Sequence, residues 1–265
     1  MDKISKAVRI ARAGRKRVGA AAFGQEPSLQ KIEYSTTRKD EPDIGLWRRN
    51  KILAALDDDA VHDAYKLLRT RVAQRLSQHG WNTIGVTSSV ADEGKTLTAI
   101  NLALSIARTL DHTVLLVDAD LRRPSIHKML GLEPEAGIVD CLEGRATVPE
   151  VLVTPGIDRF VVMPGRSGTN ASSELLSSPQ MAALVRDLKH RYPSRIVLFD
   201  LPPVLLGDDV VAFAPLMEAM ILVIEDGKAT RQGLSKALEL LDQTPVLGTV
   251  LNRSSSESRG YDYYY

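Results

Sequence analysis

The chain of 265 residues has little of several features that would otherwise define its class. Its one cysteine, Cys141, excludes an intramolecular disulfide and has no neighbouring Cys or His to form a metal site. No apolar run reaches the ~18 residues of a membrane span, and the basic start lacks the apolar stretch of a secretory signal. A net charge of only +1 gives no overall field for nucleic acid. We therefore expect a cytosolic globular protein with one large α/β domain.

Composition divides the chain into three parts. Residues 1–17 carry seven Lys or Arg and one acid, which is typical of a solvated arm, although a surface helix on anionic lipid or an acidic partner stays open. Residues 18–45 mix Gly, Pro, Ser and charges without a period, which indicates a linker. We therefore predict a basic arm and linker over residues 1–50, an α/β domain over 51–253 and a tyrosine-rich tail over 254–265.

Strand and helix patterns alternate through the predicted domain. A first helix over residues 58–77 has a face of apolar residues at helical spacing: Val61, Tyr65, Leu68, Val72 and Leu76. Six apolar strands are then predicted at 83–87, 114–118, 159–163, 195–200, 220–224 and 246–251. Helices are predicted between them at 97–110, 124–129, 179–190 and 231–241. This order predicts a doubly wound, mostly parallel sheet with ligands at the carboxyl ends of its strands.

The stretch Val86–Thr96, VTSSVADEGKT, is the most informative part of the chain. A strand, a tight loop ending in Gly94, Lys95 and Thr96, and a helix form the arrangement that binds nucleotide phosphates through backbone N–H groups. Lys95 would reach the β- and γ-phosphates, and the Thr96 hydroxyl would bind Mg²⁺. The strict pattern has Gly where this chain has Ser89, so a chance match at a helix start is the alternative.

Carboxylates follow two of the predicted strands. The segment VLLVDADLRRP, 114–124, brings Asp118 and Asp120 to the edge where the loop lies, on the same side if the chain stays extended. Such acids can hold Mg²⁺ or orient a hydroxyl nucleophile, whereas a strand end capped by a turn Asp is the alternative. In IVLFDLPP, 196–203, Asp200 resembles a second Mg²⁺-binding position.

Aromatic residues make up only 5% of the chain, yet four tyrosines stand in its last five positions. Tyr261, Tyr263, Tyr264 and Tyr265 follow polar residues and cannot form a core. We interpret them as phosphoacceptors, because an acceptor tyrosine must be able to enter another molecule's active site. A sticky tail or docking peptide is the alternative.

Together these motifs resemble the bacterial tyrosine kinases of capsule and exopolysaccharide systems, over about residues 58–265. The loop, the segment VLLVDADLRRP and the segment IVLFDLPP are similar to that family's three nucleotide motifs, and the tyrosine-rich end completes the set. DAYKLLRT at 63–70 resembles a motif for ring-like self-association, here as Asp63, Lys66 and Arg69. The chain departs from the family at Ala91, Asp92 and Leu201, which replace Pro, Gly and Thr.

The resemblance implies the fold of phosphate-loop NTPases of the MinD/ParA-like class, with ATP and Mg²⁺ as cofactors. It assigns catalysis to Asp118, Asp120, Lys95 and Arg122, and metal binding to Thr96, Asp118 and Asp200. It assigns the nucleotide to Ser88, Ser89, Asp92, Glu93, Gly94, Lys95, Thr96 and Leu97. Asn252, at the end of the last strand, is a candidate for the adenine edge or an ordinary turn residue.

Implied partners are a separate membrane chain-length-determinant protein (a polysaccharide co-polymerase), neighbouring subunits in a ring-like homo-oligomer and a cognate tyrosine phosphatase. The chain would then be cytoplasmic and recruited to the inner face of the plasma membrane. Two other functions stay open. One is a MinD/ParA-like ATPase switch, although these proteins have a second lysine where this chain has Val90. The other is a non-catalytic nucleotide-binding regulator of polysaccharide assembly.

Overall fold

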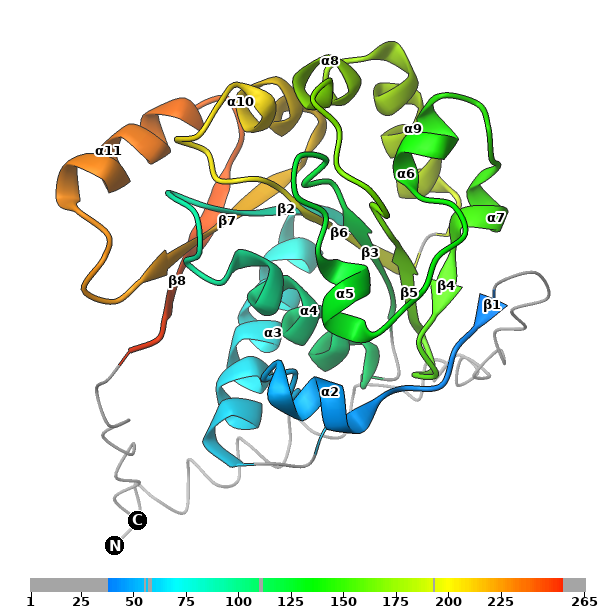
Figure 1. Ribbon diagram of the computed structural model, residues 1–265. Coiled ribbons are helices and arrows are strands. Elements are labelled where there is room, and N and C mark those ends of the chain that lie inside the picture. Colours follow the sequence, from blue (N-terminus) through cyan, green and yellow to red (C-terminus); the bar gives the residue numbers. More distant parts are fainter. Residues whose placement is uncertain (1–37, 55, 57–58, 110–111, 193, 255–265) are drawn as a thin grey trace, which may run out of the picture. The chain divides into compact units, whose positions relative to one another are not determined.

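The computed structural model describes residues 38–54, 56, 59–109, 112–192 and 194–254 (Figure 1). Its strands are β1 (Arg38–Lys39), β2 (Thr83–Ser88), β3 (Thr113–Asp118), β4 (Val153–Thr154), β5 (Phe160–Met163), β6 (Arg195–Asp200), β7 (Ala219–Glu225) and β8 (Val246–Asn252). Its longer helices are α3 (Asp59–His79), α4 (Lys95–Ala107), α9 (Pro179–His190) and α11 (Arg231–Leu240). Its shorter helices are α2 (Ile44–Arg49), α5 (Ile126–Leu130), α6 (Ile138–Leu142), α7 (Val148–Val151), α8 (Ser172–Leu176) and α10 (Asp209–Phe213), followed by the 3₁₀ turn Ala214–Leu216.

The strands form one sheet in the order β1-β4-β5-β3-β6-β2-β7-β8. All neighbouring pairs are parallel except β4 and β5, which are antiparallel. The carboxyl ends of β2, β3 and β6 therefore lie together near the middle of one edge. This confirms the predicted doubly wound, mostly parallel sheet, and it places the loop after β2 between the ends of β6 and β7.

Two apolar cores cover the two faces of the sheet. Alternate residues of β3 divide between them: Val114 and Leu116 join α2, α3, α4 and α5, whereas Leu115 and Val117 join the other core. The second layer contains α6, α8, α9, α10 and α11 (Figure 1). Because both faces are covered, the central strands are apolar throughout, which is why the sequence shows them so clearly.

The structure corrects the predicted linker. Residues 38–39 form β1, which pairs with β4, and residues 44–49 form α2. Trp47 of α2 is fully buried, and its Nε1 donates a hydrogen bond to the Leu130 carbonyl at 3.0 Å. A single tryptophan in a charged stretch gave no period to detect, so the sequence missed this helix.

The first long helix is confirmed, with one correction to its buried face. Val72 and Leu76 of α3 are buried, and Tyr65 and Leu68 are partly buried against the same core. Val61, predicted on this face, is 41% exposed, because it lies in the first turn of a helix that only later reaches the core. In the described part of the chain, no helix combines the length and apolar character needed to cross a membrane.

Candidate active site

The loop between β2 and α4 is built around Gly94. This residue has a φ of +88°, a conformation that costs glycine least. A Cβ added here would lie 2.0 Å from Nδ2 of Asn252, which donates a hydrogen bond at 2.9 Å to the Glu93 carbonyl. Glycine at position 94 is therefore required both by the backbone and by the close approach of Asn252. The Asn252 amide, a candidate for the adenine edge, is used to hold the loop.

Glu93 braces the loop from inside. Its fully buried carboxylate accepts hydrogen bonds from Ser89 Oγ at 2.7 Å and from the Val90 amide at 2.8 Å. The Glu225 amide at the end of β7 donates to it at 3.3 Å. Ser89, which stands where the strict pattern has glycine, thus has its hydroxyl satisfied within the loop. The side chains of Ser89 and Glu93 shape the loop, and a nucleotide would meet its backbone N–H groups.

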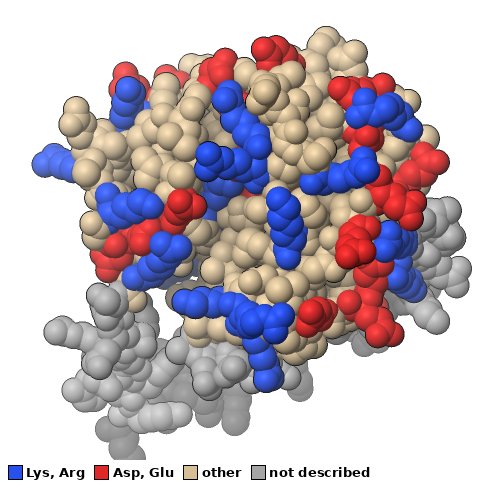
Figure 2. All heavy atoms as spheres, in the orientation of Figure 1, with Lys and Arg blue, Asp and Glu red and all other residues tan. Residues whose placement is uncertain are grey.

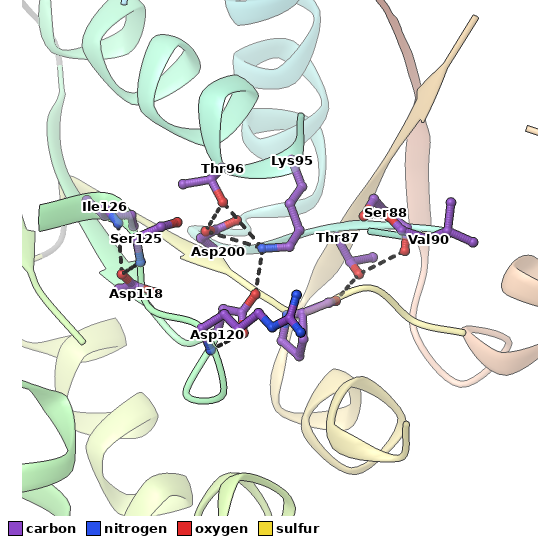
Figure 3. A network of polar contacts seen from close by, with 12 residues as sticks. Thr87, Ser88, Val90, Lys95, Thr96, Asp118, Asp120, Ser125, Ile126 and Asp200 are labelled. Atoms are coloured by element: carbon purple, nitrogen blue, oxygen red, sulfur yellow. Dashed lines mark hydrogen bonds and ion pairs between the residues drawn. The ribbon is translucent and has the colours of Figure 1, made fainter. Parts of the chain in front are cut away.

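The side chain of Lys95 lies between two carboxylates (Figure 3). Its Nζ is 2.8 Å from Oδ2 of Asp120 and 3.7 Å from Oδ2 of Asp200. Thr96 Oγ1 donates to the same Asp200 oxygen at 2.7 Å. Burial alone would lower the pKa of Lys95, but Asp200 and Asp120 outweigh it and raise the pKa, so the side chain stays an ammonium.

Asp118 faces away from this contact. Its Oδ2 accepts from the backbone amides of Ser125 at 2.9 Å and Ile126 at 3.0 Å, where α5 begins (Figure 3). Asp118 and Asp120 therefore bind different partners. Ala119 and Leu121 nevertheless join the same core as Leu115 and Val117, an alternation that keeps the two aspartates on one side as expected.

Burial raises the pKa of both strand-end carboxyl groups. The pKa of Asp118 rises to about 8, mainly through burial and then through the neighbouring charge of Asp200. Burial raises the pKa of Asp200 to about 6, against the opposing effects of Lys95 and Thr96. Oδ1 of each residue is buried without a hydrogen-bond partner among the described residues. Such unpaired carboxylate oxygens are costly unless a cation or proton satisfies them.

These residues fit a magnesium nucleotide. A cavity of about 640 Å³ opens at the loop and is lined by Gly94, Lys95, Thr96 and Asp120 among others. The described residues contain no group of three or more His, Cys, Asp or Glu side chains able to hold a metal ion alone. Mg²⁺ commonly takes only one or two protein oxygens and completes its shell with phosphates and water. Thr96 and Asp200 supply that kind of partial site.

Arginines surround the same cavity. Arg122 donates from Nε to Asp209 Oδ2 at 2.8 Å, and its NH2 lies 2.8 Å from the same oxygen. Arg253 pairs with Glu225 at 2.9 Å. Arg123 also lines the cavity, and Lys and Arg side chains gather near the centre of the face in Figure 2. Asp209 and Glu225 were not predicted from the sequence, because their arginine partners lie far along the chain.

Other predicted site residues have varied positions. Leu97 and Asp92 line the cavity, and Asp92 is exposed with a φ of +64°. The Ser88 hydroxyl donates to the Val90 carbonyl at 2.7 Å within the loop. The proposed acceptors Tyr261, Tyr263, Tyr264 and Tyr265, and the basic arm over residues 1–17, lie outside the described residues.

The predicted self-association residues lie on α3, away from the cavity. Lys66 Nζ is 3.1 Å from Asp63 Oδ1, and both side chains are exposed. Arg69 donates to the Ser105 carbonyl at 3.1 Å and thereby ties α3 to α4. Asp63 and Lys66 are thus available at the surface, whereas Arg69 already has a partner within the chain.

Comparisons with known proteins give several relatives, although no family model matches. Tyrosine-protein kinase YwqD of Bacillus subtilis is 29% identical over 220 residues, covering 82% of this chain and 92% of that protein. Tyrosine-protein kinase wzc of Salmonella typhi is 28% identical, covering 83% of this chain and 31% of that protein. The kinase domain of the Escherichia coli tyrosine kinase ETK has a TM-score of 0.71 at 27% identity, covering 86% of this chain and 94% of that one.

The chain is therefore similar to bacterial tyrosine kinases, in agreement with the family that its motifs resemble. It spans only 27% of another relative, the succinoglycan biosynthesis transport protein ExoP of Rhizobium meliloti, at 29% identity and 80% of this chain. The cell-division ATPase MinD of Pyrococcus furiosus shares the fold, with a TM-score of 0.57 at 24% identity over 67% of this chain and 74% of that one. Two of these relatives are named as tyrosine-protein kinases and one as a succinoglycan biosynthesis transport protein, and the fold is that of phosphate-loop NTPases.

Proposed function

We propose that this chain is an ATP-dependent protein-tyrosine autokinase of capsule or exopolysaccharide synthesis. It transfers the γ-phosphate of ATP to the tail tyrosines of a neighbouring subunit: Tyr261, Tyr263, Tyr264 and Tyr265. The observation that carries the proposal is the position of the Lys95 ammonium between Asp120 and Asp200, beside Thr96. This arrangement combines a phosphate-binding cation, the hydroxyl of Thr96 and the carboxylate of Asp120 at one cavity, with the buried Asp200 beside them.

Each side chain has a role that follows from its contacts. Loop amides and Lys95 hold the phosphates, and Thr96 and Asp200 bind Mg²⁺, which supplies charge neutralisation when bound. Asp118 lies beside Asp200 and anchors the start of α5 through the backbone amides of Ser125 and Ile126. Arg122, oriented by Asp209, faces the cavity and can offset charge on the transferred group.

Asp120 is the group that orients the incoming hydroxyl and accepts its proton. A tyrosine with a pKa near ~10 is protonated at neutral pH, so a nearby carboxylate is useful. In this structure Asp120 is bound to Lys95. Phosphates offer Lys95 a stronger partner, which frees Asp120 for the acceptor. Since the transition state is loose, most of the rate comes from positioning rather than from strong base catalysis.

The proposed setting is a membrane-linked assembly. The partner is a separate chain-length-determinant protein that recruits this chain to the inner face of the membrane, and a phosphatase reverses the reaction. Subunits associate as a ring through the α3 surface that carries Asp63, Lys66 and Arg69. The proposed domains are a basic arm, a kinase domain that includes β1 and α2 and ends at residue 253, and the acceptor tail. Four phosphates on the tail would repel one another and loosen the ring.

The test is direct labelling of the tail. The purified chain is incubated with Mg·ATP, with and without the partner's cytosolic segment. The mass of the chain's C-terminal peptide is then measured by mass spectrometry. Added phosphate on the tail that disappears in Lys95→Met supports the kinase. ATP hydrolysis without added phosphate would instead indicate an ATPase switch, and nucleotide binding without either reaction would indicate a regulator.

A further inference from the structure

Arg123 differs from the other cations that line the cavity. Lys95, Arg122 and Arg253 each contact a carboxylate, so their charges are already compensated. Arg123 lines the same cavity and is exposed, and no ion pair joins it to an acid within the part of the chain that the structure describes. It therefore offers an uncompensated guanidinium at the rim of the site.

The backbone fixes Arg123 beside Asp120. Its amide donates to Asp120 Oδ1 at 3.0 Å and lies 3.1 Å from the Asp120 carbonyl oxygen. The following residue is Pro124, which restricts the backbone of Arg123 to extended conformations. The Cα of Arg123 is thus held close to the carboxylate that would receive the acceptor hydroxyl, while its long side chain can reach outward to a bound segment.

We propose that Arg123 binds a phosphate already present on a tyrosine next to the one being phosphorylated. The inference rests on the proposed function and adds a substrate preference to it: a segment that carries an aryl phosphate. Arginine pairs with phosphate through two parallel hydrogen bonds, which suits this ligand better than a neutral tyrosine. Arg123 is thus a specificity-determining residue, and the first phosphate on a tail accelerates the next.

The spacing of the tail matches this geometry. Tyr261 and Tyr263 are two positions apart, and in an extended peptide such residues are separated by ~7 Å and point to the same side. A hydroxyl at Asp120 would then place the neighbouring phosphate within reach of Arg123. In each step the tyrosine oxygen bonds to the γ-phosphorus, the bond from that phosphorus to the bridging oxygen breaks, ADP leaves and the hydroxyl proton passes to Asp120.

The experiment follows the number of phosphates per tail on the full chain over time. In the wild type we expect doubly and triply phosphorylated tails while unmodified tails are still abundant. In Arg123→Gln we expect phosphates to be distributed at random at the same total labelling, because the ratio of the later rates to the first rate should fall about tenfold from its wild-type value. Arg123→Lys should fall between them, because lysine keeps the charge without the paired geometry.

Controls separate this inference from the proposed function. Arg186→Gln removes an exposed arginine of α9 that does not line the cavity, and it should behave as the wild type. Absence of any tail phosphate in the wild type would defeat the proposed function. A normal first phosphorylation with the same random distribution in wild type and Arg123→Gln would overturn only the role of Arg123. A raised KM for ATP in Arg123→Gln with an unchanged distribution would also overturn it.

Discussion

Asp200 and Asp118 end the adjacent strands β6 and β3 and are paired directly across them, yet their side chains bind different partners. Both are fully buried. Asp200 contacts the side chains of Thr96 and Lys95, which belong to the phosphate loop and α4. In the described part of the chain, the side chain of Asp118 accepts hydrogen bonds only from backbone amides, those of Ser125 and Ile126. Two equivalent strand ends of the parallel sheet thus have different roles. Asp200 belongs to the candidate active site, and Asp118 holds the turn before α5.

The difference shows that a carboxylate's role depends on what its lone pairs already bind. Asp118 uses one oxygen to hold the start of α5, and its raised pKa means that it keeps a proton near neutral pH in the nucleotide-free chain. Asp200 binds groups that a nucleotide and metal would also contact, and Asp120, just beyond β3, holds Lys95 from the other side. Substitutions at these aspartates test the comparison, beginning with the largest expected effect.

Asp200→Asn should lower tail phosphorylation by about 100- to 1,000-fold, the cost of removing a group that stabilises transition-state charge. It should also weaken Mg²⁺-dependent binding of ATP, because the amide replaces a charged oxygen ligand. Both are measured by mass analysis of the tail and by fluorescence titration with a labelled nucleotide. Asp187→Asn, on the exposed side of α9, is the control and should leave both unchanged. Wild-type labelling by Asp200→Asn would remove this residue from the site.

Asp120→Asn should lower labelling by roughly 100-fold, within the range for loss of a general base. Binding of ATP should be kept or slightly strengthened, since Lys95 loses the carboxylate that competes with phosphate. Isothermal titration with ATP and a labelling time course measure the two effects. If Asp120→Asn loses nucleotide binding as well, its proposed role toward the tyrosine hydroxyl is wrong.

The sequence predicted the phosphate loop, the six main strands and the edge where Asp120 and Asp200 lie, because local motifs and apolar strands carry that information. It could not predict that Asp118 binds the amides of Ser125 and Ile126, because these contacts depend on how the chain turns between β3 and α5. It also missed Asp209 beside Arg122, since the two residues are 87 positions apart and no period connects them. Trp47 was missed for the same reason, because its burial arises from tertiary contacts.

Asp118→Asn should change how the stability of the nucleotide-free chain depends on pH. The pKa of Asp118 is raised from 3.8 to about 8 in the folded state, so the folded chain binds the extra proton between these values. Stability from this group is therefore present at low pH and is lost as pH rises toward 8. Asparagine cannot ionise, so its stability relative to the wild type should increase from pH 6 to pH 8. Urea unfolding at several pH values measures the difference, and a constant difference would contradict the raised pKa.

Asp92 lies on the exposed side of the loop, and its substitution should have the smallest effect. Its φ of +64° is more favourable for glycine than for most residues, but Asp tolerates it better than alanine does. Asp92→Gly should therefore change the free energy of unfolding by less than about 1 kcal/mol, whereas Asp92→Ala should lower it by about 1 kcal/mol. Removing the charge should also lower the KM for ATP modestly in both variants, because like charges no longer meet at the cavity. Equal unfolding curves for the two variants would show that the loop relaxes at this position. A decrease in the KM for ATP shared by both variants would show that the charge of Asp92 weakens ATP binding.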